Sequence, residues 1–172
     1  MTAETRPQPE SGESMPFDRY LFFWFGHVDA LYRHRVRQLL KALGISLPLW
    51  RALASLHAAQ PCTVSELAEI TVIERTALAR VLAQAETDGL IAREEDETDR
   101  RRMRLRLTEK GNEAHARARG VVHAYYMGIL GDTPEAEVDQ AVAFMRRLVR
   151  NMGGSGHHLS FAQRGEASQQ DT

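Results

Sequence analysis

The chain has 172 residues, which is enough for one domain with a sizeable core and extensions beyond it. Its formal net charge is only −1, so bulk charge gives no nucleic-acid signature, and any such function must depend on where individual arginines lie. The single cysteine, Cys62, excludes an internal disulfide framework and a multi-cysteine metal site.

The two ends of the chain differ in composition from its middle. Residues 1–14 and 153–172 are polar and rich in Gly, Ser, Gln and Glu, which is typical of disordered tails. No apolar run reaches membrane-spanning length and no signal-peptide core is visible, so we expect a cytoplasmic protein without membrane contact. One folded domain is therefore expected over residues 15–152.

The folded part begins with a long amphipathic helix over about residues 16–43, because apolar residues keep helical spacing from Phe17 to Leu43. Aromatic side chains widen its apolar surface beyond what one small domain needs on one helix. This surplus favours a dimer contact over the alternative that the aromatic residues fill a monomer core. Gly44 ends the helix, and Ser46 caps a second, shorter one.

Two short helices follow, joined by a tight link. The first begins at Thr63-Val64-Ser65, where small hydroxyl residues suit capping, and extends to Ile70. The second runs from about Glu74 to Asp88. Such a pair forms a helix-turn-helix. The second helix carries an apolar stripe at the spacing of one buried face, namely Leu78, Val81, Leu82 and Ala85.

The face of the second helix opposite this stripe is free to face DNA. Arginine can pair with guanine edges or phosphates, threonine can donate to either or touch a thymine methyl, and alanine permits close approach. The alternative is a solvated helix face, but the basic hairpin directly downstream favours DNA contact. The residues on or beside this face are Arg75, Thr76, Ala79, Arg80, Ala83 and Thr87.

A β-hairpin with an arginine-bearing tip is predicted between Gly89 and Gly111. In its returning strand Met103, Leu105 and Leu107 alternate with arginines, so one face packs and the other carries charge. A cationic hairpin at the end of a helix has the geometry of a winged helix, in which the wing reaches the DNA backbone or minor groove. The alternative is a solvated hairpin with surface arginines. The alternating arginines are Arg102, Arg104 and Arg106.

An acidic run from Glu94 to Glu97 precedes the tip of this hairpin. Carboxylates next to phosphates would weaken DNA binding. We therefore expect these residues to lie on the outer edge of the wing or to hold arginines in place.

Two further helices complete the chain. Thr108 caps a helix that runs to about Leu130, residues 131–134 break the chain, and a last amphipathic helix follows. The predicted fold class is mainly α with a small β-wing (α+β), a winged helix-turn-helix flanked by N- and C-terminal helices.

In order and register, these elements resemble the MarR (multiple antibiotic resistance regulator) family of winged-helix transcription factors over roughly residues 17–152. In that family a wing arginine enters the minor groove and an aspartate orients it, which implies these roles for Arg101 and Asp99. This chain departs from the pattern by adding further arginines after Arg101. The resemblance is carried by Leu67-Ala68, Leu78, Val81-Leu82, Asp88-Gly89-Leu90-Ile91, Asp99-Arg100-Arg101 and Leu107-Thr108-Glu109-Lys110-Gly111.

The resemblance implies a sequence-specific regulator that binds double-stranded DNA. The family's first and last helices interlock across a two-fold axis, so a DNA-binding lobe over about residues 46–108 lies between dimerisation helices over about 16–43 and 109–152. A homodimer would place two recognition helices about 34 Å apart on a pseudo-palindromic operator. The predicted DNA-binding residues are Arg75, Thr76, Ala79, Arg80, Asp99, Arg101, Arg102 and Arg104.

Family members are commonly repressors released by small aromatic or phenolic anions, so the resemblance implies such a ligand here. An aromatic floor with a histidine or arginine anchor would suit an aromatic carboxylate. For His27 the alternative is a core histidine hydrogen-bonded to a carbonyl, and this is the simpler explanation. The candidate ligand residues are Trp24, His27, Trp50, Arg51 and His123.

Other functions have less support in the sequence. The seven histidines show no metal-ligand spacing, which disfavours a metal-responsive regulator. Cys62 does not match the first-helix sensing cysteine of the family's peroxide-responsive branch, so a structural thiol is favoured over a redox sensor. A winged helix used only for protein contacts stays open. The chain lacks a phosphate-binding glycine loop, a nucleophile elbow and a metalloprotease helix motif, so we expect no enzyme and no cofactor.

Overall fold

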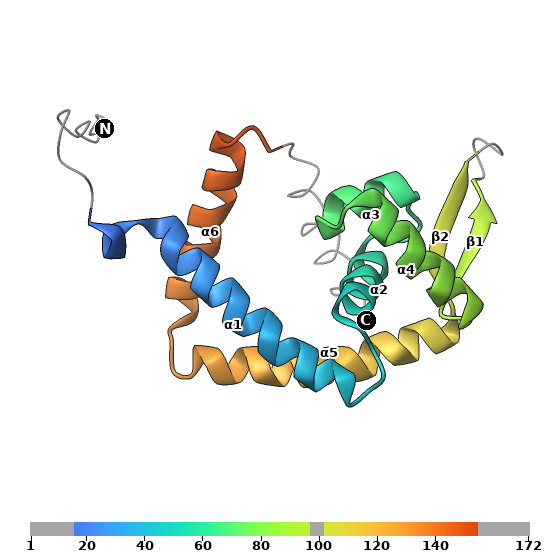
Figure 1. The fold of residues 1–172 in the computed structure, drawn as a ribbon, viewed down its shortest axis with the longest axis horizontal. Helices are drawn as coiled ribbons and strands as arrows, with labels where there is room; N and C mark the ends of the chain where they lie inside the picture. The colour runs from blue at the N-terminus through green and yellow to red at the C-terminus, as the bar shows by residue number, and fades with distance from the viewer. Residues whose placement is uncertain (1–15, 97–101, 155–172) are drawn as a thin grey trace. The chain divides into compact units, whose positions relative to one another are not determined.

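The computed structural model describes residues 16–96 and 102–154 (Figure 1). The chain divides into two compact units, Met1–Arg35 and Val36–Thr172. The elements are a 3-10 helix η1 (Phe17–Arg19), α1 (Leu21–Lys41), α2 (Leu47–Ala59), α3 (Val64–Thr71), α4 (Arg75–Thr87), β1 (Ile91–Glu95), β2 (Met103–Leu107), α5 (Glu109–Leu130) and α6 (Glu135–Asn151). A mainly helical fold with a small antiparallel sheet confirms the predicted fold class.

The first unit contains η1 and most of α1. Tyr20 separates them with extended backbone angles (φ −80°, ψ 107°), so the prediction of an unbroken helix from Phe17 is wrong over its first four residues. The Trp24 Nε1 donates to the carbonyl of Asp18 at 2.6 Å, which ties η1 to the first turn of α1. Large apolar side chains of this unit stay accessible, including Phe22 at 49% and Trp24 at 53% exposure.

The second unit is built around α2. As predicted, Ser46 caps this helix, with its hydroxyl accepting from the Leu49 amide at 3.3 Å. The helix contacts α3, α4, α5 and β2, and Figure 1 shows it between α3 and α5. One face of α2 is buried, through Leu53 and Leu56 among others, against side chains that the neighbouring elements also bury, namely Leu67, Leu78, Leu82 and Leu105. This core fixes α4 relative to the sheet.

Two backbone carbonyls join the end of α4 to the start of α5. Gly89 adopts φ 69°, and the Leu90 amide donates back to the Ala85 carbonyl at 2.8 Å, an arrangement that closes the helix end. The Leu90 carbonyl then accepts from the Thr108 amide at 3.1 Å. The Thr108 hydroxyl donates to the Gly89 carbonyl at 2.7 Å and accepts from the Gly111 amide at 3.0 Å. We call these contacts of Gly89, Leu90, Thr108 and Gly111 the wing-base junction.

Between these two points β1 and β2 pair in antiparallel register, with Ile91 opposite Leu107 and Glu95 opposite Met103. Leu105 and Leu107 are buried, as the alternation predicts, while Met103 is 42% exposed at the outer end of its strand. Leu105 also exchanges two backbone hydrogen bonds with Cys62, Cys62 N to Leu105 O at 3.4 Å and Leu105 N to Cys62 O at 2.7 Å. The segment before α3 thereby extends the sheet, which the sequence pattern did not predict.

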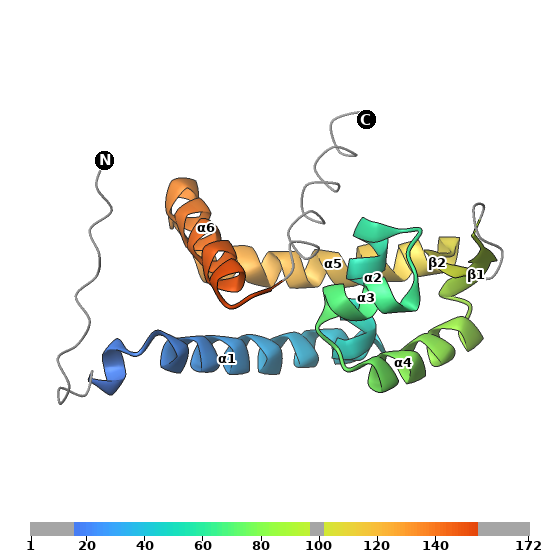
Figure 2. The same ribbon diagram turned by 90° about the horizontal axis from the view of Figure 1, so that it is seen from above.

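The last two helices begin and end close to the predicted positions. Thr108 caps α5, which continues to Leu130, and Gly131 (φ 59°) ends it before α6. No residue of α6 is buried. The second half of α5 exposes Tyr126, Met127 and Ile129. Figure 2 shows α5 as one long helix followed by the turn into α6.

A stack of three rings joins α2 to α5. The ring of His115, 6% exposed, lies with its centroid 5.5 Å from that of Trp50 and 4.1 Å from that of His57. Burial, assisted by the nearby His57 and Arg119, lowers the pKa of His115 to about 4. The His115 ring is therefore neutral at pH 7 and packs as an aromatic group.

Gly111 and Gly120 give a matched test of the wing-base junction within one helix. A Cβ added at Gly111 would overlap the carbonyl oxygen of Leu90, so Gly111→Ala should lower the free energy of unfolding, by roughly 1–3 kcal/mol as for overpacked cores. A Cβ at Gly120 meets no atom within 4 Å, so Gly120→Ala should stabilise α5 by about 1 kcal/mol. Urea unfolding followed by circular dichroism measures both. A Gly111→Ala protein as stable as the wild type would contradict this junction.

Candidate nucleic-acid interface

The helix-turn-helix begins with a reciprocal cap. The Thr63 hydroxyl accepts from the Glu66 amide at 3.2 Å, and the Glu66 carboxylate accepts from the Thr63 amide at 2.7 Å. These bonds satisfy amides at the start of α3 that have no partner within the helix. The hydrogen bond from Thr63 is also the main cause of a lowered Glu66 pKa. The predicted start of the first short helix is confirmed.

The turn between α3 and α4 is pinned from α2. An Arg51 guanidinium nitrogen donates to the carbonyl of Thr71, and the Thr71 hydroxyl donates to the Leu67 carbonyl at 2.8 Å. The next residue, Val72, adopts left-handed angles (φ 50°, ψ 36°), which β-branched residues rarely take, and it is 78% exposed. The pinned neighbours hold Val72 in this conformation, so the tight turn is a fixed feature.

Glu74 caps the start of α4. Its carboxylate accepts from the amides of Thr76 at 2.8 Å and Ala77 at 2.9 Å, and these bonds lower the pKa of Glu74. A carboxylate of this chain therefore already occupies two of the amides at the start of α4.

The outward face of α4 has the composition that the sequence predicts. Leu78, Leu82 and Ala85 are buried, whereas the predicted contact residues of this helix are exposed. Small side chains alternate with arginines along that face, so the helix backbone can approach a groove closely. The exposed residues on it are Arg75, Thr76, Ala79, Arg80, Ala83 and Thr87.

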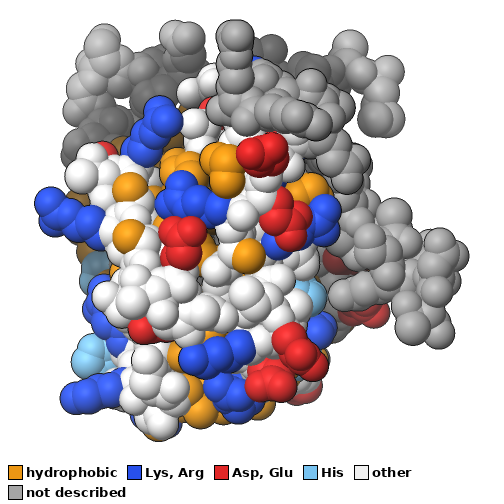
Figure 3. Space-filling model, turned by 90° about the vertical axis from the view of Figure 1, so that its right-hand side faces the viewer, with side chains coloured by type: hydrophobic (Ala, Val, Ile, Leu, Met, Phe, Trp, Pro, Cys, Tyr) orange, Lys and Arg blue, Asp and Glu red, His pale blue; other side chains and the backbone are white. Residues whose placement is uncertain are grey.

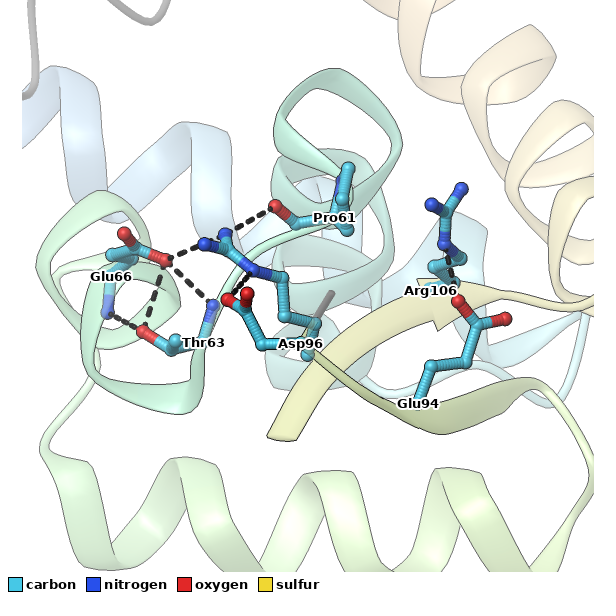
Figure 4. Close-up of polar contacts among 7 residues, drawn as sticks. Pro61, Thr63, Glu66, Glu94, Asp96 and Arg106 are labelled. Carbon is cyan, nitrogen blue, oxygen red and sulfur yellow. Dashed lines mark hydrogen bonds and ion pairs between the residues drawn. The ribbon is translucent and has the colours of Figure 1, made fainter. Parts of the chain in front are cut away.

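In the wing, carboxylates of β1 pair with arginines of β2 (Figure 4). Arg106 Nε lies 2.6 Å from Glu94 Oε2, and both side chains are about half exposed. Arg104 Nε pairs with the carboxylate of Asp96, a residue that is only 4% exposed. The acidic run was predicted either to lie on the outer edge of the wing or to hold arginines in place. The second role is confirmed for Glu94 and Asp96.

Arg104 reaches further than the wing. Its Nη1 donates to the carbonyl of Pro61 at 3.2 Å and lies 4.0 Å from the Glu66 carboxylate. Arg104 was predicted to contact DNA, and the structure instead shows its guanidinium engaged within the chain. A DNA contact by Arg104 stays a prediction.

The tip of the wing carries the remaining predicted contacts. Asp99 and Arg101 lie outside the described residues, so the pairing between them stays a prediction. Arg102 is exposed at the start of the returning strand, and its carbonyl accepts from the Asp96 amide at 2.9 Å. This backbone hydrogen bond joins the two residues that flank residues 97–101.

Basic and acidic side chains lie intermixed on the face shown in Figure 3. Glu86 on α4, for example, pairs with Arg93 of β1 at 3.0 Å. Such exposed pairs contribute little to stability, because water screens them. Individual arginines, rather than one uniform positive field, therefore decide where an anionic partner can bind.

The predicted ligand residues fall in both units of the chain. Trp24 and His27 belong to the first unit, where His27 is exposed and its Nδ1 lies 2.9 Å from the Phe23 carbonyl oxygen. The alternative explanation of His27 as a core histidine is wrong, because the residue is exposed, but the expected contact with a backbone carbonyl is present. In the second unit Trp50 stacks on His115, Arg51 bonds to the α3–α4 turn, and His123 is exposed on α5.

The ring stack of Trp50, His115 and His57 was missed as a unit by sequence reasoning. Trp50 and His57 are seven residues apart on α2 and therefore share one face, which is the signal that could have found them. His115 comes from a helix far along the chain, and no local pattern points to it.

Cys62 has the environment of a structural thiol. It is buried beside β2, and burial raises the pKa of its thiol to about 12. Within the described residues no group of three or more His, Cys, Asp or Glu side chains could hold a metal ion. In the same part of the chain no helix is long and apolar enough to cross a membrane.

Comparisons with known proteins agree with this architecture. The sequence model of the MarR family matches residues 43–102, which include α2, the helix-turn-helix and the first strand of the wing. The HTH-type transcriptional repressor IacR of Pseudomonas putida is 23% identical over 144 residues, covering 84% of this chain and 86% of that protein.

Solved structures extend the match beyond the helix-turn-helix. A MarR-family transcriptional regulator from Silicibacter pomeroyi superposes with a TM-score of 0.71 at 26% identity, covering 78% of this chain and 90% of that one. CouR from Rhodococcus jostii RHA1, bound to p-coumaroyl-CoA, gives 0.72 at 18% identity, with coverages of 78% and 95%. MepR from S. aureus, in complex with DNA, gives 0.70 at 17%, with coverages of 80% and 99%.

The last two likenesses concern the fold, whereas the family match, the repressor relative and the Silicibacter structure identify the group. In the sequence of its helix-turn-helix region and in its winged-helix fold, the chain is similar to the MarR family of transcriptional regulators.

Proposed function

We propose that this protein is a sequence-specific regulator that binds double-stranded DNA as a homodimer. One observation carries the proposal: α4 buries one face in the lobe and exposes arginine, threonine and alanine on the other, with a paired wing fixed to its end. A helix with such a face fits a major groove, while a basic wing reaches the backbone or minor groove. The MepR–DNA complex supports it, since a protein of this fold binds DNA.

Each part of this surface has its own role in the proposal. Arg75, Thr76, Ala79 and Arg80 enter the major groove from α4. Arg102 approaches the phosphates at the wing, and Arg101, oriented by Asp99, enters the minor groove as the family resemblance implies. The Glu74 cap occupies the amides of Thr76 and Ala77 at the start of α4, so the proposal assigns the contacts to phosphates and bases mainly to side chains.

Replacing Arg80 by alanine should weaken DNA binding, because an exposed cation of the recognition helix is lost. A base contact of this kind contributes roughly 1–3 kcal/mol, and a phosphate contact lowers the salt slope by about one unit. Fluorescence anisotropy with the DNA upstream of the chain's own gene, at several salt concentrations, measures both. Arg101→Ala should behave similarly.

Arg117→Ala, which removes an exposed arginine from α5 instead, is the matched control and should bind like the wild type. A winged helix used only for protein contacts predicts a different pattern. In that case Arg80→Ala and Arg101→Ala would match the control at every salt concentration.

Dimerisation is proposed from apolar surface that the described chain leaves accessible. On α1 and the preceding turn, Phe17, Trp24 and Leu31 are 69%, 53% and 69% exposed, and no residue of α6 is buried. Monomeric proteins rarely expose apolar surface of this extent. A second copy of the chain is the proposed cover, as the interlocking first and last helices of the family imply.

Deleting residues 1–31 should abolish dimerisation and operator binding together, because it removes the exposed aromatic residues while keeping the buried Val36 and Leu40. Sedimentation velocity and a gel shift report the two properties. Deleting residues 1–15 alone, which keeps these aromatic residues, is the control and should preserve both. A chain lacking residues 1–31 that sediments as a dimer and still shifts operator DNA would refute the proposal.

We further propose that the protein is a repressor released by a small aromatic or phenolic anion. The relative IacR is a repressor, and CouR holds an aromatic acyl thioester in the same fold. In the second unit Trp50 offers an aromatic surface and Arg51 a cation. Trp24, His27 and His123 remain further proposed ligand residues, each taken by itself. Since the His115 ring is neutral at pH 7, charge recognition falls to other groups, foremost Arg51.

Titration calorimetry with a panel of aromatic carboxylic acids tests this effector class. At least one acid should bind, and His27→Ala should weaken its binding because a polar anchor on the aromatic helix is lost. Unchanged affinity in the His27→Ala protein would remove His27 from the site. No heat with any acid of the panel would contradict the effector class itself.

A further inference from the structure

Arg104 differs from Arg93 and Arg106 in what its guanidinium contacts. Arg93 and Arg106 each pair with one exposed carboxylate. Arg104, with a side chain 29% exposed, meets the carboxylate of Asp96, the carbonyl of Pro61 and the carboxylate of Glu66 (Figure 4). These partners come from the residue after β1, the segment before α3 and the first turn of α3. One side chain therefore connects the wing to the helix-turn-helix.

The burial of Asp96 makes this contact energetically different from the exposed pairs. Asp96 is 4% exposed, and a buried carboxylate is costly unless cations and donors compensate it. Its amide also donates to the Arg102 carbonyl at 2.9 Å, which closes the hairpin before the tip. Removing the Arg104 charge would take away the ion pair that Arg104 Nε makes with the Asp96 carboxylate.

Glu66 links the same network to the start of α3. Its Oε2 accepts from the Thr63 amide and hydroxyl at 2.7 and 3.0 Å and lies 4.0 Å from Arg104 Nη1. A backbone hydrogen bond connects the same two segments, because the Leu105 amide donates to the Cys62 carbonyl at 2.7 Å. The side chain of Arg104 and the backbone of its neighbour thus hold the same two segments together.

We infer that Arg104 is a positioning residue, which sets the wing against the first turn of α3 through Asp96, Pro61 and Glu66, and that it does not itself contact DNA. The inference rests on the proposed DNA binding only for its effect on affinity. The connection between the wing and α3 exists without DNA and has its own readout.

The variant Asp96→Asn separates the two roles by the sign of its effect. If Arg104 contacted phosphates, Asp96→Asn would remove a competing negative charge and tighten DNA binding. If Arg104 positions the wing, Asp96→Asn should weaken binding by roughly tenfold, an effect in the usual range for coupled side chains. Arg104→Gln should weaken it equally, and the double variant should bind no worse than either single one.

The test uses the full chain, the DNA upstream of its own gene and a temperature at which every variant is folded. Arg104→Lys keeps the charge but loses the planar fork, so it should recover only part of the affinity. Arg106 lies on the same strand as Arg104, and Arg106→Gln breaks its exposed pair with Glu94 of β1. This variant is the matched control. It should leave the Asp96 effect unchanged.

Hydrogen exchange without DNA measures the connection itself. Arg104→Gln and Asp96→Asn should each lower protection of the Leu105 and Asp96 amides, and Arg106→Gln should not. If the wild type binds no DNA, the proposed function fails, but this exchange pattern still tests the connection. Unchanged protection in Arg104→Gln, or tighter DNA binding by Asp96→Asn, would overturn the inference.

Discussion

The backbone carbonyls of Gly89 and Leu90 are the point on which the arrangement of α4, the wing and α5 depends. Their bonds to Thr108 bring the end of α4, the base of the wing and the start of α5 to one place. The Thr108 hydroxyl, having donated to Gly89, accepts from the Gly111 amide, and only glycine fits there against the Leu90 carbonyl. The direction of the wing relative to the recognition helix is therefore fixed by backbone geometry at its base.

A second connection acts further out along the wing. Leu105 pairs with Cys62, and Arg104 joins Asp96 to Pro61 and Glu66, so the hairpin is held to the segment entering α3. In the proposed function, the helix-turn-helix and the wing approach DNA as one body, which reduces the ordering cost of binding. The intermixed charges fit this arrangement, because carboxylates that hold arginines in chosen directions are more useful for specificity than a uniform positive surface.

Sequence periodicity predicted what depends on neighbours along the chain. The buried and exposed faces of α4, the alternation of Leu105 and Leu107, and the caps Ser46, Thr63 and Thr108 follow from local spacing and were confirmed. The acidic run was predicted to hold arginines in place, but the contact of Arg104 with Pro61 could not be predicted, since Pro61 is 43 residues away along the chain. The break at Tyr20 was missed because helical spacing continues across it.

Footprinting of the full chain on the DNA upstream of its own gene tests the central claim most directly. The account predicts a protected pseudo-palindrome whose two half-site centres lie about one DNA turn, roughly 34 Å, apart. Protection should survive an excess of unrelated competitor DNA, since base contacts from α4 distinguish the site. Absence of a protected site, or protection that the competitor removes as readily as it removes binding to random DNA, would contradict a sequence-specific regulator.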